Sequence, residues 1–161
     1  VGSLVQARSI TRAWPSAAEV LATKFWPGPL TLVLPKIERV PDLVTSGLDT
    51  VGVRCPNHPV TLSLLSSLDF PLAAPSANPF GYVSPTTADH VQKQLGEQLP
   101  YILDGGPCRV GVESTIVGFE QNRVIVYRLG GLDIETIEDA VGPVSTQTNF
   151  SSNPKAPGQL S

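Results

Sequence analysis

Short apolar runs, separated by proline and glycine, dominate the pattern of this chain. Residues 30–34 (LTLVL) and 50–54 (TVGVR) predict strands, and a proline ends or closely follows each of them. Residues 71–74 (PLAA) and 101–103 (YIL) also predict short strands. Residues 114–119 and 124–128 predict two more, joined by a loop that is too short for a crossover, so they must pair as an antiparallel hairpin.

Helical spacing alternates with these strands, and each predicted helix begins at a residue that can cap or open it. The predicted helices are residues 17–25 after the capping box Ser16-Ala-Ala-Glu19, residues 59–68 opening at Pro59, residues 87–95 capped by Thr86 and ended by Gly96, and a short helix from Asp133 to Gly142. Helices and strands that interleave around a hairpin predict a mixed α/β (α+β) fold. We expect a twisted mixed sheet flanked by helices.

Composition narrows the class of protein. Hydrophobic residues make up 41% and charged residues 16% of the 161 residues, which excludes intrinsic disorder. The 16 prolines interrupt the chain too often for a helical bundle. No apolar run approaches the roughly 20 residues of a membrane span, so we expect no membrane association. The two cysteines cannot form a disulfide framework for a chain of this size, so we expect reduced thiols and a cytoplasmic location.

The net charge of −3 argues against a large polyanionic partner. An acidic domain without a basic stripe is a poor candidate for binding nucleic acid through phosphate charge. We therefore expect any bound polyanion to be small and to contact a few well-placed Arg and Lys residues.

The two ends of the sequence suggest a piece of a longer protein. Methionine is absent, and the chain opens without a helix or strand signal of its own. Residues 144–161 are rich in Ser, Thr, Asn, Gln and Pro and contain one charged residue, Lys155. We predict one domain over residues 1–143 and the start of an interdomain linker over residues 144–161.

Several motifs leave more than one chemistry open. No Walker A or Gly-x-Gly-x-x-Gly motif is present, and Gly105-Gly106 fits either a tight turn or a phosphate nest. Ser114 is not part of a Gly-x-Ser-x-Gly nucleophile motif. A Ser–His hydrolase would have only His58 and His90 as its base. Cys55 and His58 have metal-ligand spacing. His90 and Cys108 lack it, so a zinc site competes with ordinary loop positions.

Small polar residues cluster where predicted strands end, at residues 75–78, 84–87, 113–115 and 128–131. In mixed α/β folds ligands gather at such ends, because small residues let the backbone approach a ligand. Turns and helix caps use the same residue types, so both interpretations stay open.

Seven segments, each weak by itself, follow a common order. They are residues 24–34 (KFWPGPLTLVL), 51–59 (VGVRCPNHP), 74–78 (APSAN), 84–87 (SPTT), 103–107 (LDGGP), 111–117 (GVESTIV) and 128–131 (RLGG). In this order they resemble the Sua5/YrdC/YciO family over about residues 1–143. The resemblance implies the YrdC-like fold, a twisted mixed sheet with helices around a concave face. Residues 154–158 (PKAPG) are similar to the start of the linker in Sua5-type members.

The best-known members of this family are threonylcarbamoyl-AMP synthases, which are nucleotidyltransferases. The resemblance therefore implies that L-threonine, bicarbonate and ATP, with Mg²⁺, give threonylcarbamoyl-AMP and pyrophosphate. A downstream tRNA threonylcarbamoyl transferase then modifies adenosine 37 of tRNA. Two alternatives remain: a YciO-type member without this activity, and a module that binds RNA without this activity. Weak binding of tRNA or other RNA is a separate expectation.

The resemblance also assigns candidate site residues. A carboxylate that attacks an α-phosphate needs cations and fixed dipoles, which Arg54 and Arg128 can supply unless they form surface ion pairs. Hydroxyl and amide groups for adenylate or threonine are expected from Thr31, Ser76, Asn78, Ser84 and Ser114.

We assign no catalytic side chain and no metal ligand. The family's N-terminal strands carry a Lys-x-Arg motif that contacts the substrates, and no pair in this sequence matches it. We therefore expect the N-terminal strands of the fold to be missing and residues 1–161 alone to be inactive.

Overall fold

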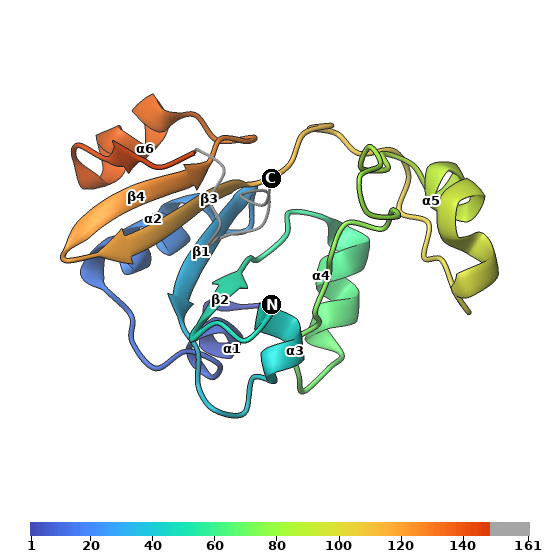
Figure 1. Ribbon diagram of the computed structural model, residues 1–161, viewed down its shortest axis with the longest axis horizontal. Coiled ribbons are helices and arrows are strands. Elements are labelled where there is room, and N and C mark those ends of the chain that lie inside the picture. Colours follow the sequence, from blue (N-terminus) through green and yellow to red (C-terminus); the bar gives the residue numbers. More distant parts are fainter. Residues whose placement is uncertain (149–161) are drawn as a thin grey trace.

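The computed structural model describes residues 1–148, in which helices and strands alternate (Figure 1). The elements are α1 (Leu4–Arg8), α2 (Ser16–Phe25), β1 (Leu30–Pro35), α3 (Asp42–Thr45), β2 (Thr50–Val53), α4 (Pro59–Ser66), α5 (Ala88–Leu95), the 3₁₀ helix η1 (Gly96–Gln98), β3 (Thr115–Glu120), β4 (Arg123–Arg128), α6 (Ile134–Val141) and β5 (Ser145–Thr146).

One mixed sheet organises these elements, in the order β2-β1-β3-β4-β5. β1 pairs antiparallel with β2 and parallel with β3, with Leu30 opposite Thr115. β3 and β4 form the predicted antiparallel hairpin, and β4 pairs in parallel with β5. The predicted mixed sheet is therefore confirmed.

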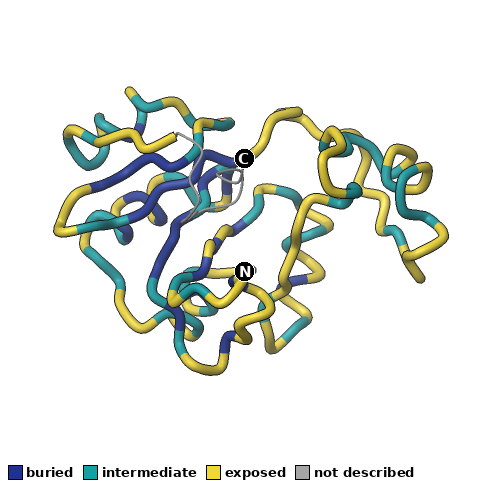
Figure 2. Tube along the Cα trace, in the orientation of Figure 1, coloured by how far each residue is buried: buried dark blue, intermediate teal, exposed yellow. Residues whose placement is uncertain are grey.

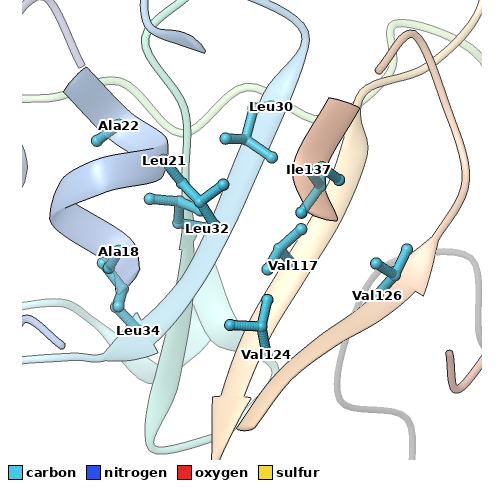
Figure 3. Close-up of a cluster of buried hydrophobic side chains, with 10 residues drawn as sticks. All are labelled: Ala18, Leu21, Ala22, Leu30, Leu32, Leu34, Val117, Val124, Val126 and Ile137. Atoms are coloured by element: carbon cyan, nitrogen blue, oxygen red, sulfur yellow. The ribbon is translucent and has the colours of Figure 1, made fainter. Parts of the chain in front are cut away.

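Helices α2 and α6 cover one face of the sheet. Because side chains alternate along a strand, Leu30, Leu32 and Leu34 of β1 all point to that face, and all three are fully buried. The core there joins three residues of α2, these three of β1, three of the β3–β4 hairpin and one of α6 (Figure 3): Ala18, Leu21, Ala22, Leu30, Leu32, Leu34, Val117, Val124, Val126 and Ile137.

The other face of the sheet carries a smaller buried cluster that includes Val33, Ile116 and Tyr127. The Tyr127 ring lies against Gly118, where an added Cβ would meet the ring at 2.2 Å. The Tyr127 hydroxyl donates to a carboxylate oxygen of Glu120 at 2.6 Å. Burial, and then the Glu120 carboxylate, raise the pKa of Tyr127 far above its ordinary value, so the hydroxyl stays protonated.

A long excursion, residues 67–113, separates β2 and α4 from β3, and we call it the arm. The structure describes all of it, and none of its residues is buried, whereas buried residues concentrate in β1, β3 and β4 (Figure 2). Helix α5 in the arm lies well away from the sheet (Figure 1). The strands predicted at residues 71–74 and 101–103 are wrong, because both runs lie in the arm and pair with no neighbouring strand.

Other differences from the sequence prediction concern short elements and helix ends. Helices α1 and α3, of five and four residues, were not predicted. Ser16 is the first residue of α2 rather than its cap, and Thr87 caps α5 instead of Thr86. Strand β5 lies within the predicted linker, of which residues 149–161 lie outside the described part. Within residues 1–148, every helix is too short or too polar to span a membrane.

Candidate functional site

A cavity of about 580 Å³ lies where the arm meets the ends of β2, β3 and β4. The sheet contributes charged and hydroxyl side chains at these strand ends, namely Arg54, Ser114 and Arg128. The arm contributes small residues and backbone, at residues 75–77, 84–88 and 102–106. The cavity therefore lies at strand ends rich in small polar residues, where the sequence pattern placed a ligand site.

Arg128, the last residue of β4, is held by the first residues of the neighbouring strand. Its Nε donates to the Ser114 carbonyl oxygen at 3.1 Å, and its Nη2 donates to Ser114 Oγ at 3.2 Å. Ser114 Oγ also lies 2.7 Å from Thr31 Oγ1 on β1. These contacts fix the plane of the guanidinium at the cavity wall.

The third nitrogen of Arg128 faces a carboxylate. Arg128 Nη1 forms an ion pair with Glu113, whose other oxygen accepts from Ser84 Oγ at 2.9 Å. Glu113 is thus bonded to the sheet through Arg128 and to the arm through Ser84. The Arg128 side chain is 23% exposed and that of Glu113 is 45% exposed, so the pair lies at the cavity surface and remains partly accessible.

Arg54 supplies a second cation from the end of β2. Its Nε donates to the Gly28 carbonyl oxygen at 3.1 Å, and the Gly28 N–H donates to the Cys55 carbonyl oxygen at 2.9 Å. Among the described residues, Arg54 forms no ion pair. Its guanidinium is therefore open to an anion on the side that faces the cavity.

Both arginines are partly shielded from water, Arg54 less than Arg128, and the charge of Arg54 acts on Arg128. Burial lowers the pKa of Arg54, while the nearby Cys108 and Glu113 oppose the shift. Burial also lowers the pKa of Arg128, and Arg54 lowers it further, whereas Glu113 raises it. Two cations that line one cavity both attract an anion that is bound there.

The loop after Arg128 is anchored to β3 by the fully buried Thr115. Thr115 Oγ1 donates to the Leu132 carbonyl oxygen at 2.6 Å and accepts from the Leu132 N–H at 3.0 Å. Gly130 lies so close to the start of β3 that an added Cβ would lie 2.3 Å from the Glu113 carbonyl oxygen. This close packing sets the position of Arg128 relative to residues 113–115.

Five of the seven predicted site residues line the cavity: Arg54, Ser76, Ser84, Ser114 and Arg128. Thr31 lies behind them and contacts Ser114. Asn78 is not among the lining residues, since its amide donates to the carbonyl oxygens of Pro79 at 2.9 Å and Tyr82 at 3.0 Å within the arm. Sequence reasoning missed Glu113, although a charge directly before Ser114 was the available signal.

Residues 1–148 contain no assembled site for the zinc, Ser–His or glycine-nest chemistry that the sequence left open. There, no group of three or more His, Cys, Asp or Glu side chains is placed to hold a metal ion. Ser114 Oγ contacts Thr31 and Arg128 rather than a histidine. The Gly106 N–H donates to Asp104 Oδ1 at 2.8 Å, so the two glycines form a turn held by its own side chain at the cavity edge.

Comparisons with known proteins agree with one another. The family model Sua5_yciO_yrdC, described as "Telomere recombination", matches residues 1–130. The threonylcarbamoyl-AMP synthase of Pyrococcus abyssi is 46% identical over 144 residues, which are 89% of this chain and 42% of that protein. The threonylcarbamoyl-AMP synthase of Bacillus subtilis is 39% identical over 158 residues, 98% of this chain and 46% of that protein.

Solved structures support the same grouping. The Pyrococcus abyssi Sua5 structure in complex with L-threonine superposes with a TM-score of 0.94 at 43% identity, over 99% of this chain and 48% of that one. Escherichia coli YciO superposes with a TM-score of 0.72 over 84% of this chain and 66% of that one, and its 22% identity shows the shared fold alone. The chain thus spans less than half the length of these two synthases.

Proposed function

Because this chain belongs to the Sua5/YrdC/YciO family, we propose that it forms the adenylate-synthesising domain of a threonylcarbamoyl-AMP synthase. The reaction joins L-threonine, bicarbonate and ATP and releases pyrophosphate. The observation that carries the proposal is the pair of guanidiniums, Arg54 and Arg128, at one cavity lined by hydroxyl groups.

The proposed chemistry suits this arrangement. The carboxylate formed from threonine and bicarbonate attacks the α-phosphate of ATP, and negative charge accumulates on the phosphate oxygens. Fixed cations at that point stabilise the transition state, and no nucleophilic side chain is needed. Arg128 is held by two contacts with Ser114 before the ligand arrives, so its guanidinium is already oriented.

The hydroxyl groups supply orientation. Ser114 Oγ lies between Thr31 and Arg128, which makes it a hydrogen-bonding group at the floor of the cavity. Ser76 and Ser84 come from the arm and can contact the same ligand from the opposite side. We propose that a bound nucleotide or threonine bridges the sheet and the arm through these groups.

Mg²⁺ is part of the proposal only as a companion of ATP. The cavity lining holds two carboxylates, and Glu113 bonds Arg128 and Ser84 while Asp104 bonds the Gly106 N–H. These residues do not fit a dedicated magnesium site, which uses free carboxylates. We therefore assign the ion to the triphosphate and derive no step from it.

The remaining partners follow from the family. We propose that threonylcarbamoyl-AMP passes to a tRNA threonylcarbamoyl transferase that acts on adenosine 37, and that the protein works in the cytoplasm. Direct binding of tRNA is weak in this proposal, since the net charge of −3 provides little attraction for a polyanion.

Ligand binding by residues 1–161 is the first test. Calorimetry with AMP should show binding that Arg128→Ala weakens by about 1–3 kcal/mol, the range of a charged hydrogen bond. Unchanged affinity in a folded variant would assign Arg128 a purely structural role. Arg123→Ala, at the exposed start of the same strand, is the matched control and should leave the affinity unchanged.

Turnover is the second test. Pyrophosphate release is measured with ATP, L-threonine and bicarbonate, each omitted in turn. From the family resemblance, residues 1–161 alone should release pyrophosphate on the order of 100-fold more slowly than a version preceded by the family's Lys-x-Arg segment, which adds cations. Release that does not depend on threonine and bicarbonate in the extended version would refute the proposed function.

A further inference from the structure

Glu113 contacts the strongest anion-binding group of the cavity. Its two oxygens bond Arg128 Nη1 and Ser84 Oγ, which are groups that a phosphate or carboxylate ligand would itself require. The remaining Arg128 nitrogens are occupied by Ser114. With its own carboxylate in place, the protein thus contacts each of the three nitrogens of Arg128.

Arg54, the second arginine of the cavity, differs from Arg128 in its contacts. Arg54 donates a hydrogen bond from Nε to the Gly28 carbonyl oxygen and, within residues 1–148, forms no ion pair. An anion can therefore approach Arg54 directly, but at Arg128 it has to compete with Glu113. Glu113 can be displaced because its side chain is 45% exposed and regains hydration when it leaves.

We propose that Glu113 is an internal competitor that closes the Arg128 anion site until an anionic ligand group displaces it. This inference rests on the proposed function and adds a residue to that site. The displacing group is a pair of anionic oxygens, from the phosphate of the nucleotide or from the carboxylate of threonine. On displacement, Glu113 also releases Ser84, so the arm loses one contact with the sheet and gains the ligand in its place.

The test compares two variants that remove the same charge from the same cavity. Glu113→Gln removes the carboxylate that bonds Arg128. Asp104→Asn removes the other lining carboxylate, whose oxygen holds the Gly106 N–H and can be replaced by an amide oxygen. Binding of AMP, adenosine and L-threonine is measured by calorimetry for the wild-type chain and for both variants.

We expect Glu113→Gln to bind AMP or L-threonine about three- to tenfold more tightly, the range for release of a partly exposed ion pair. Adenosine, which has no anionic group, should bind equally to all three proteins. The ligand whose affinity increases is the one that competes with the Glu113 carboxylate, whose charge acts on both Arg128 and Arg54. If Glu113→Gln binds neither anion more tightly, or if Asp104→Asn gains as much, the proposal is overturned.

Glu113→Asp separates the local contact from the net charge. The shorter side chain keeps the charge but cannot reach both Arg128 and Ser84, so anion binding should still tighten, by less than in Glu113→Gln. If Glu113→Gln does not fold, this variant decides the question alone. Affinity equal to or weaker than that of the wild type would then overturn the proposal.

A failure of the proposed function would look different. In that case AMP and L-threonine would bind to none of the proteins, and inorganic phosphate would serve as the probe of Arg128. Tighter phosphate binding by Glu113→Gln would support the competitor role without any synthase activity. Phosphate affinity that does not exceed that of the wild type would reject it.

Discussion

Replacing Thr115 by valine tests whether the hydroxyl group of this buried residue holds the loop that follows Arg128. Thr115 is fully buried, and its Oγ1 bonds both the N–H and the carbonyl oxygen of Leu132. Valine has the same shape and cannot make either bond. Thr115→Ser is the matched control, because it keeps the hydroxyl group and loses only a methyl group.

The expected magnitudes follow from these contacts. Thr115→Val leaves two half-buried backbone groups of Leu132 without a partner, each at about 1–3 kcal/mol, so the free energy of unfolding should fall by about 2–6 kcal/mol. Thr115→Ser loses one buried methyl group, which lowers the same quantity by about 1 kcal/mol. Valine should therefore be the more harmful substitution, although it is the more hydrophobic one.

Urea unfolding, followed by circular dichroism, gives the free energy of unfolding of both variants. The two values can be compared if the m-values are equal. A smaller loss for Thr115→Val than for Thr115→Ser would refute the reasoning, since it would mean that the hydroxyl group contributes less than the methyl group. Weaker AMP binding by Thr115→Val under conditions where it is folded would show that the loop transmits the defect to Arg128.

Two further predictions concern groups outside the cavity wall. Asn78→Leu removes the two hydrogen bonds from the Asn78 amide to the carbonyl oxygens of Pro79 and Tyr82. Limited proteolysis within the arm should therefore speed up several-fold, while the midpoint of global urea unfolding stays unchanged. A loss of global stability would contradict the idea that the arm opens separately from the core. The pKa of Tyr127 is raised above its ordinary value of 10.0, so the stability linked to its protonated form is present below that pH and is lost as pH rises above it. Tyr127→Phe should reduce the loss of stability between about pH 8 and about pH 10.5, and an unchanged alkaline loss would assign the effect to other groups.

The sheet core was predictable because its signals are local and consistent. Residues 30–34 and 50–54 are short strand-like runs that are closed by prolines, and the two-residue loop before Arg123 allows only a hairpin. The runs at 71–74 and 101–103 carry the same local signal, but the structure gives them no neighbouring strand. Pairing is a property of the tertiary structure, so the apolar pattern alone could not separate the two cases.

The candidate site was predictable in its residue types and only partly in its geometry. Arg54 and Arg128 stand out as the cations at strand ends, and both line the cavity. Asn78 shares a segment with Ser76, yet its side chain turns to its own loop, which spacing cannot reveal. The role of Glu113 depends on a contact with Ser84, 29 residues away, and no local rule predicts such a pair.

The arm has a consequence for how sequences of this fold can diverge. It leaves the sheet after α4 and returns at β3, and its length enters folding mainly through the entropy of closing one large loop. Doubling the length of a loop costs only about 0.6 kcal/mol, so insertions and deletions in the arm are thermodynamically inexpensive. Arg54 directly follows β2 and Ser114 directly precedes β3, so the sheet fixes their positions even where the arm changes. Evolution can therefore change the part of the cavity that the arm forms, and with it the accepted ligand. The part that the sheet forms, with its arginines, stays constant.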